Sequence, residues 1–127
     1  MIVLDASAAV TALLNDGLAR RLISGDTISA PHLVDTEVIS TLRRQSAGGV
    51  VTPEAARRAL DVWARLGIIR YAAAPLLDRV WDLRDNVTAY DAMYVALAEA
   101  LDCPLVTADA RLSRAPGIRC AVTVVPN

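Results

Sequence analysis

Short apolar segments alternate with longer helix-like segments along the whole chain. Five segments have the composition of buried strands: 1–4, 27–31, 67–73, 104–107 and 120–125. Helices are expected after Asp5, over 33–47, over 52–66, from Pro75 to about Arg84, over 86–102 and, briefly, from Asp109. Strands that are separated by helices pair in parallel, because antiparallel neighbours need only a short turn between them. The pattern therefore predicts an α/β sandwich around a parallel sheet.

The length of the chain fits one compact domain with its own core, so residues 1–127 are expected to form a single domain. Its 13 basic residues are all arginine and face 14 acidic ones, and the formal net charge is −1. No general basic field attracts a polyanion, so any contact with nucleic acid must be local.

The N-terminus lacks the basic region of a signal peptide, and no segment approaches the length of a membrane span. We therefore expect a cytoplasmic protein without a membrane partner. Cys103 and Cys120 lie in apolar surroundings, which suits reduced thiols better than a disulfide framework.

Acidic residues follow two of the predicted strands. Asp5 and Asp109 are each expected at the first position after a strand, where the carboxyl ends of parallel strands form a crevice. Glu37 lies close to the apolar face of its predicted helix, where a carboxylate is costly unless something binds it. Asp91 lies in the first turn of another helix, near Tyr94. Four carboxylates from separate segments are thus expected to converge.

Such a convergence needs a cation. Two carboxylates about 4 Å apart repel by roughly 4 kcal/mol at an effective dielectric constant near 20. Because the ligands are oxygens and no His or Cys cluster is present, a hard ion is expected, Mg²⁺ or Mn²⁺ rather than Zn²⁺. Ions of this kind support phosphodiester cleavage, so a metal-dependent nuclease is the leading interpretation.

Each of these residues also has a structural interpretation. Asp5 and Asp109 fit helix caps, and the sequence from Thr88 to Asp91 fits a capping box. Glu37 has no comparable capping role. The hydroxyls of Ser7 and Thr107 are expected to orient Asp5 and Asp109, although small polar residues are common at such turns. The aromatic residues and the exposed arginines are most simply core, interface or solvated residues; they include Trp63, Trp81, Tyr90, Tyr94 and Arg111.

Together these segments resemble a known family. The stretches "MIVLDASA", "APHLVDTEVISTLRR", "TAYDAMYVALAEALDCPLVTADARL" and "PGIRCAVTVV" are similar, in order and spacing, to PIN-domain proteins of the VapC type, the toxins of toxin–antitoxin pairs. The resemblance spans the chain and implies a three-layer α/β/α sandwich. It also implies a Mg²⁺- or Mn²⁺-dependent endoribonuclease that cuts structured RNA, is silenced by a VapB-like antitoxin and commonly forms homodimers.

The resemblance places the family's acidic quartet on Asp5, Glu37, Asp91 and Asp109. Of these, Asp5, Asp91 and Asp109 are the expected metal ligands, and Glu37 is expected to place the attacking water or a second ion. Thr107 matches the family's supporting hydroxyl. Many relatives carry Asn three residues after the helix acid, where this chain has Ser40. Ser40 can still form hydrogen bonds.

Two other functional classes remain open. A non-catalytic PIN-like module would bind RNA or a protein partner without cutting, although it would have no need for four repelling acids. An aspartyl-phosphate protein would also place acids at strand ends beside Mg²⁺. Such proteins usually use a lysine near the phosphate, and this chain has none.

Overall fold

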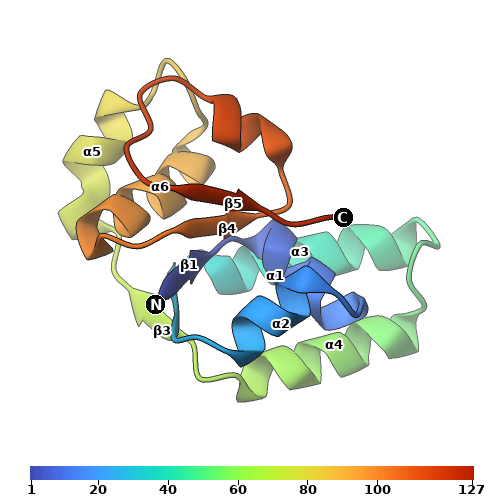
Figure 1. Cartoon of the computed structure of the whole chain (residues 1–127). Coiled ribbons are helices and arrows are strands. Elements are labelled where there is room, and N and C mark those ends of the chain that lie inside the picture. Colours follow the sequence, from blue (N-terminus) through green and yellow to red (C-terminus); the bar gives the residue numbers. More distant parts are fainter.

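The computed structural model describes residues 1–127 and contains five strands, six α-helices and two short 3₁₀ helices (Figure 1). The strands are β1 Ile2–Leu4, β2 Ile28–Pro31, β3 Ile69–Tyr71, β4 Leu105–Thr107 and β5 Val122–Val124. The helices are α1 Ala6–Leu14, α2 Leu18–Ser24, α3 Val34–Ala47, α4 Pro53–Arg65, α5 Leu77–Asp82 and α6 Ala89–Leu101, with 3₁₀ helices η1 Ala74–Leu76 and η2 Ala110–Arg114.

All neighbouring strands pair in parallel, in the order β3-β2-β1-β4-β5. Helices α1 to α4 pack together on one face of the sheet, and α6 with α5 covers the other (Figure 1). This arrangement confirms the predicted three-layer sandwich. The strand order reverses at β1 and β4, so the crevice between their carboxyl ends is the place where such sheets bind ligands.

Local sequence explains where the main helices begin. Thr52 caps α4 through a hydrogen bond from the Ala55 amide, with Pro53 in the first turn. Thr88 caps α6 in the same way, accepting from the amide of Asp91. Helix α3 ends before Gly48-Gly49, where Gly49 has a φ of 75° that favours glycine.

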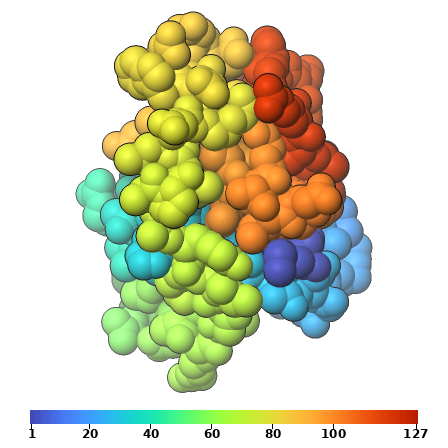
Figure 2. All heavy atoms as spheres, turned by 90° about the vertical axis from the view of Figure 1, so that its left-hand side faces the viewer, coloured from blue at the N-terminus to red at the C-terminus, as the bar shows by residue number.

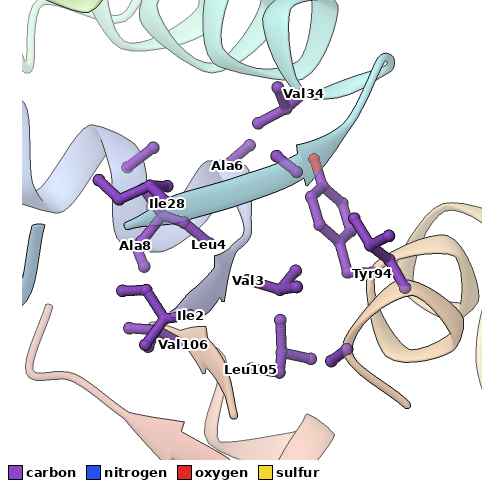
Figure 3. Close-up of a cluster of buried hydrophobic side chains, with 14 of the residues drawn as sticks. Ile2, Val3, Leu4, Ala6, Ala8, Ile28, Val34, Tyr94, Leu105 and Val106 are labelled. Carbon is purple, nitrogen blue, oxygen red and sulfur yellow. The ribbon is translucent and has the colours of Figure 1, made fainter. Parts of the chain in front are cut away.

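The core lies on both sides of β1 and β4, the strands with helices on both faces. Twenty-nine buried apolar residues form one continuous cluster, and Val3, Leu4 and Leu105 in it are fully enclosed. Figure 3 shows these strand residues packed between the helix layers, with Tyr94 of α6 reaching past them. A rigid, close-packed centre therefore supports the strand ends that carry Asp5 and Thr107.

Four features differ from the sequence prediction. The segments 67–73 and 120–125 form strands of only three residues, because both are sheet edges with one neighbour and partial exposure. The helix predicted from Pro75 is divided into η1 and the short α5. Asp109 is the second residue after β4, not the first, since the strand ends at Thr107.

The face of the molecule opposite the crevice carries the amino ends of the strands. In Figure 2 the yellow segment around α5 lies over the orange α6, and the dark-blue N-terminus lies beside the end of α6. There the Met1 ammonium group forms an ion pair with Asp26. No helix in the structure has both the length and the apolar character needed to cross a membrane.

Candidate active site

A cavity of about 730 Å³ opens at the carboxyl edge of the sheet, and all four predicted acids line it. Asp5 caps α1 after β1, Glu37 lies in the first turn of α3, Asp91 in the first turn of α6, and Asp109 caps η2 after β4. The capping interpretation is therefore correct for Asp5 and Asp109. Capping does not exclude a functional role, because the same side chains face the shared cavity.

Asp5 is the most enclosed of the four acids, with 6% of its surface exposed. Its carboxylate accepts hydrogen bonds from the hydroxyls of Ser7 (2.6 Å) and Thr107 (2.5 Å) and from the amide of Ala8 (2.9 Å). Thr107 also accepts from the amide of Asp109 (3.0 Å), and its hydroxyl lies 3.3 Å from that of Ser7. These contacts place both predicted hydroxyls against Asp5 and fix its orientation.

The pKa of Asp5 is nevertheless raised above its ordinary value. Burial is the largest cause, and the charge of Asp91 adds to it, while the hydrogen bonds lower the pKa in part. Only neutral donors contact this buried carboxylate, so a cation bound beside it would stabilise its ionised form.

Glu37 is held from the opposite helix layer. The Tyr94 hydroxyl donates to its carboxylate at 2.6 Å. Figure 3 shows the ring of Tyr94 among the apolar side chains, with its hydroxyl directed away from them and toward the α3 side. The pKa of Tyr94 is raised far above its usual range, chiefly by burial and by Glu37, so the hydroxyl stays protonated and acts as a donor.

Sequence reasoning assigned Tyr94 to the core or an interface and missed this contact. Its position three residues after Asp91 on the same helix was the only available hint. Burial raises the pKa of Glu37, and the charges of Asp91 and Asp5 raise it further, against the opposing effects of Tyr94 and Arg44.

Asp35, two residues before Glu37, provides an internal contrast. Its carboxylate accepts from Arg70 (2.6 and 2.9 Å) and from the Trp63 indole (2.8 Å), outside the cavity. The hydrogen bonds from Arg70 are the largest cause of its lowered pKa. Asp35 is therefore a structural acid that links α3, α4 and β3, whereas Glu37 has no cationic partner within salt-bridge distance.

Asp91 and Asp109 both line the cavity and are close enough for their charges to interact. Burial and the charge of Asp109 raise the pKa of Asp91. Asp109 behaves in the opposite way: Arg111 donates to both of its carboxylate oxygens (3.1 and 3.0 Å), and this pairing lowers its pKa. The side chain of Arg111 is 85% exposed, so water replaces this contact readily.

The donor set suits a hard divalent ion. It consists only of carboxylate oxygens. The pKa values of Asp5, Glu37 and Asp91 are raised by burial and by the charge of a neighbouring acid. However, no three His, Cys, Asp or Glu side chains are grouped closely enough to hold an ion as they stand. Of the four acids only Asp109 forms an ion pair, so Asp109 must exchange Arg111 for the ion before it can serve as a ligand.

Ser40 lies on the same helix as Glu37 and holds a neighbouring arginine. Its hydroxyl accepts from Arg44 at 2.9 Å, and Thr41 accepts from the same guanidinium at 3.3 Å. Arg44 lines the cavity on the side of Glu37. Ser40 stands where many relatives have Asn. Its hydroxyl holds Arg44 at the cavity and forms no hydrogen bond with one of the acids.

Comparison with known proteins places the chain in a family. The model of the PIN domain matches residues 2–118. Ribonuclease VapC9 of Mycobacterium tuberculosis is 54% identical, covering 99% of both chains, and ribonuclease VapC1 of the same organism is 46% identical, covering 97% of this chain and 96% of the other.

Solved structures agree on the fold. VapC20 of Mycobacterium tuberculosis, described as a sarcin-ricin loop cleaving toxin, superposes with a TM-score of 0.68 at 19% identity, covering 94% of this chain and 97% of that one. VapBC2 from Rickettsia felis, solved bound to a DNA fragment from its promoter, gives 0.69 at 20% identity, with 98% and 99% covered. The sheet, the acids at its carboxyl edge and the end-to-end sequence match lead to one assignment: the chain belongs to the PIN-domain family, among its VapC ribonucleases.

Proposed function

We propose that the acidic cavity hydrolyses phosphodiester bonds in RNA, and that this endoribonuclease is the toxin of a toxin–antitoxin pair. VapC ribonucleases of the PIN family generally depend on a divalent metal ion. Mg²⁺ is the preferred ion in this proposal, with Mn²⁺ as a substitute, since both favour carboxylate oxygens. The observation that carries the proposal is the single cavity shared by four acids from four segments.

The acids take different roles. Asp5, Asp91 and Asp109 are the proposed ligands, and Ser7 and Thr107 hold Asp5 in place for that task. When bound, a divalent ion stabilises negative charge on the attacking and leaving oxygens.

Glu37 is the proposed general base. Its raised pKa brings the carboxylate closer to the working pH, which improves proton acceptance from a water molecule. Tyr94 donates to one oxygen of Glu37, which lines the cavity, and leaves the other oxygen free to accept a proton, so Tyr94 acts as a positioning residue.

The substrate and partners follow from the relatives. A structured RNA is the proposed substrate, as for VapC20, which is described as cleaving the sarcin-ricin loop. A VapB-like antitoxin is the proposed inhibitor, by analogy with the VapBC2 complex. The single domain over residues 1–127, the homodimer and the cytoplasmic location belong to the same proposal.

Cleavage of a structured RNA by the purified chain tests the proposal. We expect products in Mg²⁺ or Mn²⁺, none in EDTA, and an unchanged melting temperature in EDTA because the core does not depend on the ion. Asp5→Asn is expected to reduce kcat by at least about 100-fold while the fold is kept. Full cleavage in EDTA would exclude the metal mechanism, and no cleavage with either ion would favour a non-catalytic module.

Two acids on α3 provide a matched pair for the same assay. Glu37→Gln is expected to lose cleavage and to keep its stability, since it removes a carboxylate whose charge is disfavoured by burial. Asp35→Asn is expected to keep cleavage and to lose about 1 kcal/mol of stability, because its partly exposed contact with Arg70 is screened by water. The opposite result, with cleavage lost only in Asp35→Asn, would refute the role of Glu37.

A further inference from the structure

A second cavity, of about 510 Å³, adjoins the acidic one and shares Asp91 and Asp109 with it. One wall is the loop between α5 and α6, which contributes Arg84, Asn86 and Thr88. The other wall is η2, which contributes Arg111 and Leu112. The two cavities therefore adjoin at these two acids.

Arg84 is the unpaired cation of the second cavity. Arg111 is occupied by Asp109, whereas Arg84 forms no ion pair, although Asp85 also lines the cavity. Its guanidinium carbon lies 4.7 Å above the ring of Trp81, and its Nη1 donates to the Trp81 carbonyl at 2.9 Å. The cation is thus held in one place, so little side-chain freedom is lost when it binds an anion.

The exposure of Trp81 supports the same conclusion. This large aromatic side chain is 66% exposed and does not serve the core, in contrast to Trp63, which is 2% exposed. Its visible contact is the stacking with Arg84. The packing of α5 does not need an indole at this position. A guanidinium that is held in place does need one, because it stacks on the ring.

We propose that the second cavity binds the nucleotide next to the cleaved phosphate in an unpaired stretch of RNA, with Arg84 on Trp81 receiving its phosphate. This inference rests on the proposed function. An RNA strand whose phosphate lies over the acids must continue past them, and the next phosphate needs a cation to offset their repulsion. The cavity suits one nucleotide in size, and unpaired nucleotides are the form in which proteins usually read RNA.

Binding of a short fluorescein-labelled single-stranded RNA to the Asp5→Asn protein in Mg²⁺ tests the inference without cleavage. Adding Arg84→Ala is expected to weaken Kd about five- to tenfold and to reduce the salt dependence of log Kd by about 0.7, the value for one lost phosphate contact with a single strand. Arg84→Lys is expected to restore binding only in part, because lysine keeps the charge but loses the planar stacking. Trp81→Ala is expected to weaken Kd about two- to threefold by releasing Arg84.

Arg65→Ala is the matched control. Arg65 is also exposed, makes no ion pair and lies at the other end of α4 from the residues that line the acidic cavity. It is expected to change Kd by less than about twofold, since screening removes its effect at that distance.

Cleavage by the protein with Asp5 intact separates the two proposals. Arg84→Ala is expected to raise KM with little change in kcat and no change in melting temperature. If the parent cuts RNA but Arg84→Ala binds like Arg65→Ala, the second cavity is not a nucleotide site and the proposed function stands. If the parent does not cut RNA, the proposed function fails, and the Kd comparison still decides the inference.

Discussion

The two ends of the acidic cavity are built in opposite ways. At the Asp5 end, a buried carboxylate is surrounded by two hydroxyls and an amide, and its pKa is raised. At the Asp109 end, a more exposed carboxylate is paired with an arginine that reaches in from solvent, and its pKa is lowered. One end is fixed by the core, and the other is held by a contact that water can replace.

The difference separates two requirements of a metal-dependent site. Neutral donors orient Asp5 without cancelling its charge, so its attraction for a cation is kept. The guanidinium of Arg111 at Asp109 offsets part of the repulsion between Asp109 and Asp91 while no ion is bound. The repulsion between Asp5 and Asp91 is thus tolerated at the rigid Asp5 end. The repulsion between Asp91 and Asp109 is partly relieved at the Asp109 end, where Arg111 can move.

The largest effect is expected at the rigid end. Thr107→Val removes the donor to Asp5 and the acceptor of the Asp109 amide, both in a residue that is fully buried. Cleavage is expected to fall about 10- to 100-fold, and the free energy of unfolding by about 1–3 kcal/mol. Thr107→Ser, which keeps the hydroxyl, is the control for RNA cleavage and urea unfolding. A loss in Thr107→Ser with none in Thr107→Val would show that the methyl group, not the hydroxyl, matters.

A smaller effect of the opposite sign is expected at the adjustable end. Arg111→Ala frees Asp109 and removes a positive charge, so the affinity for Mn²⁺ is expected to rise about three- to tenfold. Titration calorimetry with Mn²⁺ measures this without RNA. Arg114→Ala, on the same 3₁₀ helix but without an ion pair, is the control. An unchanged Mn²⁺ affinity in Arg111→Ala would mean that the pair does not compete with the ion.

The smallest effect concerns stability and pH in the absence of metal. The raised pKa of Asp91 means that its ionised form opposes folding, fully so above the folded pKa and no longer below the ordinary value of 3.8. Asp91→Asn is therefore expected to stabilise the protein at pH 7, by about 0.5 kcal/mol after screening by water, and the gain should shrink as the pH falls through that interval.

Asp109→Asn is expected to show the reverse. Its lowered pKa contributes stability above the ordinary value of 3.8, and this stability is lost as the pH falls through the folded pKa. Melting temperatures of both variants and the parent, measured in EDTA between pH 7 and pH 3, provide the test. Shifts of the same sign at pH 7 would contradict the contrast between the two ends.

The sequence predicts the sheet and the four acids better than it predicts their contacts. The alternation of short apolar runs with helices is a local pattern, and so are the acids that follow β1 and β4. The bond between Tyr94 and Glu37 joins residues 57 positions apart, and Tyr94 looks like any apolar helix residue. The pairing of Asp109 with Arg111 depends on a side-chain conformation, which no spacing specifies.

The edges of the molecule were predicted least well. β3 and β5 are shorter than their apolar runs, because an edge strand has one neighbour and its hydrogen bonds end where that neighbour ends. The contact between Arg84 and Trp81 is not predicted either, since nothing distinguishes an exposed arginine before a turn in the sequence.

The central place of β1 has a consequence for incomplete chains. Its two neighbours are β2 and β4, and β4 is synthesised about a hundred residues after it. A polypeptide interrupted before β4 would present β1 as an open apolar edge, ready to join other such chains. A premature stop codon before the codon of Leu105 would therefore yield an aggregation-prone product that also lacks Asp109, instead of a weakened toxin.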